Sequence, residues 1–241
     1  MQPAAQLSKH RSDVVSLLAA TSSTAHARVR AACFHAMSQL FCHHGCTLDD
    51  AHTESLLRVA LDGIRLSVNA SARVRISALT ALISIIDGAR GFLDRLPVNT
   101  PQVLAAVTSA LHEGPLAVQE LCVTSLMSVA ERASSAQIAA YYAELMPVLI
   151  QLMQYSRANS MELLWGRSLE CCALIGESAG RDVFAADASA MVAMLSELQQ
   201  QLGSTFDAWE GKKYFLKVSD ASSFEELISG FVLRIRCKWV S

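Results

Sequence analysis

The 241-residue chain contains little glycine, proline or aromatic side chain: 11 residues are Gly, 5 are Pro, and aromatic residues make up 6%. So few turn-forming residues leave little room for an architecture of many short strands. Charged residues make up only 17%, and the formal net charge of −2 gives no general attraction to nucleic acid or to anionic lipid. No apolar run reaches membrane-spanning length, and the first residues lack the basic and apolar regions of a secretory signal peptide.

Hydrophobic residues, in contrast, make up 52% of the chain, which is the reverse of the balance found in disordered segments. The seven cysteines are an odd number, and most of them lie within apolar helical patterns. We therefore expect reduced thiols in the core of a cytosolic or nuclear protein.

One apolar pattern recurs four times along the chain, over residues 26–40, 71–85, 115–129 and 161–175. The first apolar positions of the four segments are Val29, Val74, Val118 and Leu164. These anchors are separated by 45, 44 and 46 residues. A period of about 40–47 residues with two helices in each unit is the signature of HEAT or armadillo repeats.

Within each segment the small or apolar residues lie 0, 4, 7, 8 and 11 positions after the anchor, which is one face of a helix. We name these segments the B helices and expect an A helix before each of them. The predicted A helices cover residues 5–20, 49–68, 101–113 and 136–156, and a fifth covers 185–202. The fold class is therefore predicted to be all-α, a HEAT-repeat solenoid of about four and a half repeats.

Helix-ending residues occur at the expected joints. Thr47 with Asp50 is predicted to cap the second A helix, and Pro101 to occupy the first helical position of the third. Pro147 lies inside the fourth A helix and is expected to kink it. Four glycines are placed at or just beyond the ends of B helices: Gly45, Gly88, Gly176 and Gly180.

The repeat divides the chain into a solenoid segment over residues 1–202 and an atypical C-terminal tail over residues 203–241. Aromatic residues crowd into the tail, which ends in basic positions such as Arg234 and Arg236. Two interpretations are open. The tail is either a diverged element whose aromatic side chains cap the open end of the repeat array, or a truncated or frame-shifted end of the gene product.

Three stretches resemble the importin-β family of nuclear import receptors, or karyopherins, closest to the importin five (karyopherin beta three) branch. The stretches are residues 26–33 continuing to Gln39, residues 141–147, and residues 166–176 followed by Asp187-Ala188-Ser189. The resemblance covers roughly residues 10–202 in order and keeps the repeat frame. It identifies the chain as a fragment from the middle of such a solenoid.

The resemblance implies a long HEAT superhelix that binds protein cargo on its concave side and is unloaded by the small GTPase Ran in its GTP form. Nucleoporins and Ran-GTP are the implied partners of the full-length receptor, which shuttles between cytoplasm and nucleus. No cofactor, direct nucleic-acid contact or membrane contact is implied. A generic HEAT scaffold, of the phosphatase or cytoskeletal type, has the same architecture and is the alternative.

The B-helix positions that point away from the core lie near 2, 6 and 13 residues after the anchor. They hold His35, Thr80, Asp87, Glu120, Thr124, Glu131, Glu170 and Glu177. Five of the eight are acidic and none is Lys or Arg, so a groove lined by them would favour a basic cargo. The alternative is the solvated polar face that every surface helix has.

The sequence gives little reason to expect an enzyme, a metal site or a cofactor site. It contains no H-E-x-x-H, P-loop or G-x-G-x-x-G string. Residues 176–180 do match G-x-S-x-G, but they lie at the end of a predicted B helix and not at the strand-to-helix turn that this motif requires. A cluster of Cys and His between Cys33 and His52 could supply soft metal ligands, but a second ligand doublet is missing. Cys171 and Cys172 follow Glu170 but occupy the packing face, so we expect core thiols. The paired arginines that start the first two B helices are expected to form a structural ladder: Arg28, Arg30, Arg73 and Arg75.

Overall fold

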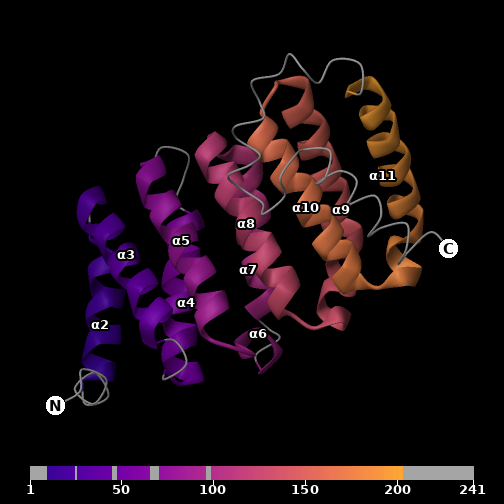
Figure 1. The fold of residues 1–241 in the computed structure, drawn as a ribbon. Helices are drawn as coiled ribbons and strands as arrows, with labels where there is room; N and C mark the ends of the chain where they lie inside the picture. The colour runs from indigo at the N-terminus through magenta and orange to yellow at the C-terminus, as the bar shows by residue number, and fades with distance from the viewer. Residues whose placement is uncertain (1–9, 25, 45–47, 66–70, 96–98, 203–241) are drawn as a thin grey trace. The chain divides into compact units, whose positions relative to one another are not determined.

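The computed structural model describes residues 10–24, 26–44, 48–65, 71–95 and 99–202, with side chains to residue 191 (Figure 1). Ten helices lie in these ranges. They are α2 (Arg11–Ser22), α3 (Ala27–His44), α4 (Asp50–Arg65), α5 (Ala72–Gly88), α6 (Phe92–Arg95), α7 (Asn99–Glu113), α8 (Leu116–Arg132), α9 (Ser135–Ala158), α10 (Glu162–Ala179) and α11 (Arg181–Leu202). No strand occurs in the described ranges, so the predicted all-α HEAT-repeat fold is confirmed. None of the helices there is both long and apolar enough to cross a lipid bilayer.

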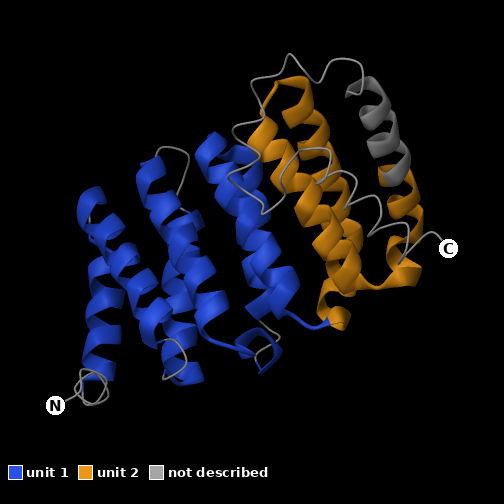
Figure 2. Cartoon of the chain, viewed as in Figure 1, with its two compact units in different colours: residues 1–134 blue, residues 135–241 orange. Residues whose placement is uncertain are grey.

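The chain forms two compact units, residues 1–134 and residues 135–241 (Figure 2). In the first unit the A helices α2, α4 and α7 form one layer, and the B helices α3, α5 and α8 form a second layer against it. In the second unit α10 packs against both α9 and α11. The predicted tail from residue 203 onward lies outside the described residues.

The apolar face of the B helices is buried as the repeat predicts. The anchors Val74, Val118 and Leu164 are each 0% exposed, and Leu82 is also 0% exposed. Val29 is different, because it is 42% exposed, so the prediction that all anchors face the core was wrong for the first repeat.

The exposure of Val29 follows from how many neighbours each B helix has. Among the described helices, α5 lies between α3 and α8, whereas α3 packs against one B helix only, α5. The residues that α3 buries include Phe34, Met37 and Phe41. The side of α3 that carries Val29 and Ala36 has no neighbouring B helix and stays open.

The helix ends differ from the sequence prediction in detail. Helix α4 is capped by Asp49, whose Oδ1 accepts a hydrogen bond from the backbone N–H of His52 at 2.9 Å. Thr47, the predicted cap, lies outside the described residues, as does Gly45. Helix α7 begins at Asn99, so Pro101 is its third residue, where proline still fits because the first turn lacks intrahelical acceptors. Helix α9 continues past Pro147, and the predicted kink there stays a prediction.

Gly176 was predicted to lie at a helix end, and this was wrong. It lies inside α10, and Gly180, at φ 100°, follows the last residue of that helix. Its lack of a side chain leaves space for the ring of Phe184 from α11. A Cβ atom on Gly176 would lie 2.5 Å from three ring atoms of Phe184. The same ring also makes an edge contact with Tyr142 of α9, which donates its hydroxyl hydrogen to Asp187 Oδ2 at 2.6 Å. A glycine, an aromatic pair and a hydrogen bond therefore hold α11 on the second unit.

Leu82→Asp and Leu126→Asp should each unfold the first unit locally, because both side chains are almost fully buried, at 0% and 2% exposure. An unpaired carboxylate there costs several kcal/mol. The measurement is thermal melting followed by circular dichroism, with Arg73→Asp, an exposed position on α5, as control. Unchanged melting of both leucine variants would show that the core face is assigned wrongly.

Gly176→Ala should lower the free energy of unfolding by about 1–3 kcal/mol, because the new methyl group must displace the Phe184 ring. In a Phe184→Ala background the same substitution should cost much less, since the ring is gone. A urea-denaturation cycle over the four proteins measures this coupling. Equal costs in the two backgrounds would contradict the proposed contact.

Candidate protein-binding surface

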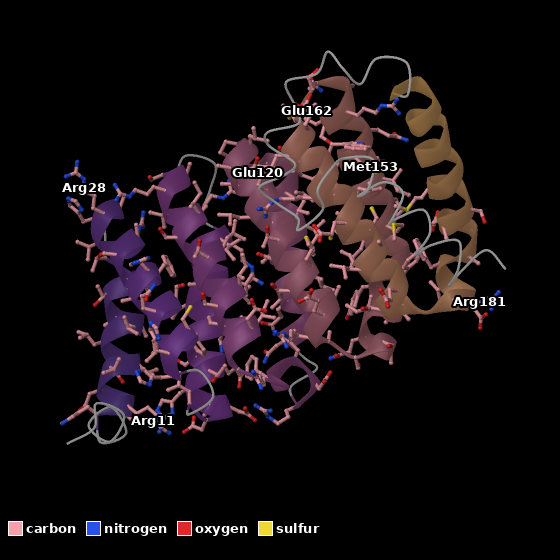
Figure 3. All side chains as sticks on the ribbon, in the orientation of Figure 1. Arg11, Arg28, Glu120, Met153, Glu162 and Arg181 are labelled. Atoms are coloured by element: carbon pink, nitrogen blue, oxygen red, sulfur yellow. The ribbon has the colours of Figure 1, made fainter. Side chains whose placement is uncertain are left out.

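The eight polar B-helix positions all remain accessible. His35, Glu131, Glu170 and Glu177 are exposed, and Thr80, Asp87, Glu120 and Thr124 are partly buried. In the first unit, α5 and α8 lie side by side and carry five of these residues, including Glu120, which Figure 3 labels. The sequence therefore identified surface positions correctly, although no contact with a partner tests them as binding residues.

The threonines contribute less polarity than their hydroxyl groups suggest. Thr80 donates its hydroxyl hydrogen to Ile76 O and Thr124 donates to Glu120 O, both at 2.9 Å within their own helices. Each hydroxyl group therefore has only lone pairs left for a partner. An acceptor-only hydroxyl adds to the preference of the surrounding carboxylates for a cationic ligand.

A basic residue that the sequence analysis missed lies at the edge of this surface. Arg132, the last residue of α8, places Nε 3.7 Å from Oδ1 of Asp87 at the end of α5. Both side chains are more than a third exposed, so the pair stabilises the fold only slightly. Arg132 follows Asp87 by one repeat period in the sequence, and this spacing could have predicted the pair. Of the three acidic residues that the first unit contributes to this surface, Glu120 and Glu131 are the two for which no ion pair is described.

In the second unit, Glu170 and Glu177 both lie on α10 and are both exposed. Their spacing of seven residues is two helical turns, which places them on the same side of the helix. The second unit thus offers a short acidic stripe along one helix.

The two adjacent thiols of α10 are core groups, as predicted. Cys171 and Cys172 are each 0% exposed. Burial raises the pKa of the Cys171 thiol well above its usual value and the pKa of Cys172 to about 12, with smaller contributions from neighbouring charges. Such thiols stay protonated at neutral pH, and the thiol form is a poor nucleophile.

The Cys and His residues near the end of α3 do not converge. Cys33 is buried and its Sγ donates to Leu18 O at 3.0 Å, whereas Cys42 is exposed and contacts Ser84 Oγ at 3.8 Å. Cys46 lies outside the described residues. Over the part of the chain that the structure describes, no group of three His, Cys, Asp or Glu side chains could hold a metal ion.

A chain of three polar side chains connects α2 to α4 and was not foreseen. Ser12 Oγ lies 3.1 Å from His52 Nε2, and His52 Nδ1 lies 2.7 Å from Asp49 Oδ1. The order is that of a hydrolytic triad, but Ser12 and Asp49 are both exposed on the surface. The backbone N–H of His52 is the main cause of the lowered pKa of Asp49, followed by smaller contributions that include its ring. The arrangement is therefore accounted for as the cap of α4 together with a link to α2.

A second link joins the short helix α6 to α4. Arg95 donates from Nε to Asp50 Oδ2 at 2.9 Å and from Nη2 to Asp50 Oδ1 at 2.6 Å. This two-point contact lowers the pKa of Asp50. The sequence analysis did not anticipate α6, because four residues are too few to show a helical period.

The predicted arginine ladder is not observed as proposed. Arg28 and Arg73 are exposed, whereas Arg75 is 3% exposed and Arg30 is partly buried. The Nε atoms of Arg30 and Arg75 are both buried without a hydrogen-bond acceptor. Direct bonds from these atoms to the next repeat are therefore absent over the described residues.

Comparison with known proteins shows what this chain is similar to. No protein-family profile matches the chain. Importin subunit beta-3 of Saccharomyces cerevisiae (strain ATCC 204508 / S288c) is 25% identical over 174 residues, which are 72% of this chain and 15% of the yeast protein. The chain is related to the importin-β family of karyopherins. This confirms the resemblance to the karyopherin beta three branch, and the karyopherin-like chain spans less than a fifth of the length of that curated relative.

Solved structures agree on the fold. The karyopherin Kap121p bound to Nup53p superimposes with a TM-score of 0.74 at 20% identity, over 95% of this chain and 20% of that one. Kap121p bound to Ste12p gives 0.73 at 20% identity, over 93% and 19%. Kap121p bound to RanGTP gives 0.70 at 21% identity, over 95% and 20%. The HEAT-repeat pairing of the karyopherin-like chain is thus that of a longer karyopherin solenoid.

In the native protein, iodoacetamide should modify Cys42 and leave Cys122, Cys171 and Cys172 unmodified. Cys42 is exposed, whereas the other three thiols are buried and have raised pKa values. Peptide mass spectrometry before and after denaturation in urea measures each site. Rapid native labelling of Cys171 or Cys172 would show that α10 opens or packs differently.

Proposed function

We propose that the chain is a protein-binding segment of a nuclear transport receptor and that its B helices bind a basic segment of a protein cargo. The observation that carries the proposal is the set of accessible carboxylates on neighbouring B helices of the first unit, Asp87, Glu120 and Glu131, with α5 and α8 in contact. A basic segment lying across the two helices would meet carboxylates from two repeats at once.

The relatives support partners of this class. The solved structures include Kap121p bound to Ste12p, to Nup53p and to RanGTP. We propose that the full receptor to which this segment belongs shuttles between cytoplasm and nucleus, contacts nucleoporins, and releases cargo on binding RanGTP. A pull-down of the full-length gene product with Ran loaded with GTP or with GDP tests this step. Equal cargo retention with the two nucleotides would contradict it.

The proposed mode of action is binding without catalysis and without a cofactor. The buried thiols are held in their protonated form by desolvation, and the Ser12–His52–Asp49 chain is accounted for as a helix cap. Neither feature places a reactive group in a cleft with positioned donors, which covalent catalysis requires. Accessible carboxylates on a repeat array suit reversible association instead.

The physical chemistry favours many weak contacts over one strong one. An exposed ion pair contributes about 0–1 kcal/mol, so a single carboxylate should add little affinity. Several carboxylates on a connected surface act on one ligand together and make the affinity depend on salt. Arg132 acts in the opposite direction, since it already neutralises Asp87.

The test is a variant that combines Glu120→Gln, Glu131→Gln, Glu170→Gln and Glu177→Gln. We expect it to keep its fold and to lose affinity for a labelled lysine- and arginine-rich peptide at low salt. The difference from the wild type should shrink at high salt, where screening already weakens the native contacts. Fluorescence anisotropy at two ionic strengths measures both effects.

The matched control removes the same charge elsewhere. It combines Asp94→Asn, Glu113→Gln, Glu144→Gln and Asp182→Asn, all at exposed positions outside the B helices. If the control loses as much affinity as the B-helix variant, only the net charge matters and the proposed surface is wrong. Equal low-salt affinities of the B-helix variant and the wild type would place the cargo site elsewhere.

A further inference from the structure

A cavity of about 320 Å³ lies in the first unit between α2, α3 and α4. Phe34, Val59 and Gly63 form part of its apolar wall, and Arg30 and Asp62 contribute charged groups. Its size is that of a small ligand-binding pocket. None of its lining residues belongs to the acidic B-helix surface described above, so it is a separate feature of the same unit.

Arg30 is the unusual member of this cavity. Its Nε atom is buried and has no hydrogen-bond acceptor, and over the described residues no carboxylate lies within ion-pair distance of its guanidinium group. Asp62, the acidic residue of the cavity, instead faces Arg65 at 3.8 Å. The only carboxylate of the cavity lining is therefore paired with Arg65 and not with Arg30.

A structural role for Arg30 can be checked against the equivalent residue in another repeat. Gln119 lies one position after the anchor of α8, as Arg30 does after the anchor of α3, and it donates to Leu111 O in the last turn of α7. By analogy, Arg30 should cap the last turn of α2. A cap of this kind is needed only where carbonyl groups of that turn lack a donor.

The carbonyl groups of Leu17 to Thr21, near the end of α2, already have donors. Thr21 Oγ1 donates to Leu17 O, Cys33 Sγ to Leu18 O, Ser22 Oγ to Ala19 O and Ser23 Oγ to Ala20 O. The backbone N–H of Thr24 donates to Thr21 O. Five consecutive carbonyl groups are thus satisfied without Arg30.

We propose that the Arg30 cavity is a second binding site and that its ligand is the carboxylate of a glutamate or aspartate side chain, carried next to an apolar residue in a protein segment. The guanidinium group presents paired donors that match a carboxylate, and a charge-assisted bond would give Arg30 the counter-ion that it lacks. The apolar wall around Phe34 and Val59 receives the neighbouring apolar side chain.

Charge decides between the possible ligands. A basic side chain would be repelled by Arg30, and a purely apolar one would shield the guanidinium group from water without supplying a counter-ion, which costs free energy. Asp62 lies at an exposed position, with 78% of its side chain accessible, and it already has Arg65 as its counter-ion. A carboxylate that enters as far as Arg30 therefore gains an ion pair.

The experiment titrates two labelled peptides into the whole chain: Leu-Glu-Leu between glycine–serine flanks, and the same peptide with Gln in place of Glu. We expect the Glu peptide to bind the wild type, and Arg30→Gln to weaken that binding by about tenfold or more. The matched control is Arg28→Gln. Arg28 is exposed, projects away from the start of α3 in Figure 3, and should be without effect.

Several outcomes would overturn the proposal: equal binding of the Glu and Gln peptides to the wild type, no binding of either, or the same loss in the Arg28→Gln variant. Thermal melting supplies a second measurement. Arg30→Gln should melt no lower than the wild type, because the charge it removes has no partner, and a clear fall would show that Arg30 has a structural role instead. Binding of the basic peptide should be unchanged by Arg30→Gln, which separates this site from the proposed cargo surface.

Discussion

The rest of the structure depends on burial of each B helix against its neighbours. In α5, eight of 17 residues are buried, and they include Val74, Ala78 and Leu82 at 0% exposure. A helix that packs on an A helix and on two B helices must be apolar over most of its circumference. The residues that burial leaves accessible on the B helices include all eight polar positions of the candidate surface. The candidate protein-binding surface is therefore a by-product of the packing that stabilises the repeats.

The helices could be predicted from sequence because the repeat supplies the same information several times. The predicted A helix over 136–156 is observed as α9, Ser135–Ala158, and the other A helices in the described ranges agree nearly as well. The errors concern contacts between helices. Val29 has the right position in its own helix but no second B helix beside it, and Gly176 resembles a helix end until Phe184 from α11 is placed over it. Neither fact is contained in the periodicity of one segment.

The candidate surface could likewise be predicted only in part. Positions such as Glu120 and Glu131 follow from helical geometry, so counting from the anchor found them. The charge partners do not follow from it. Arg132 of α8 reaches Asp87 of the neighbouring helix α5, and Arg30 Nε has no acceptor although it lies near the end of α2. Both facts depend on the orientations of several side chains at once, and a single sequence does not contain that information.

Four side-chain contacts join residues that lie about one repeat apart along the chain. Asp50–Arg95, Asp87–Arg132 and Tyr142–Asp187 each join residues 45 apart, and Ser38–Ser84 joins residues 46 apart. The repeat length thus sets how far apart in the gene the codons of two contacting residues lie. When one partner of such a contact mutates, the compensating change should arise one repeat away and seldom among its neighbours in sequence. A whole repeat can be duplicated or lost with its contacts intact, whereas a deletion within a B helix changes the pairing on both sides.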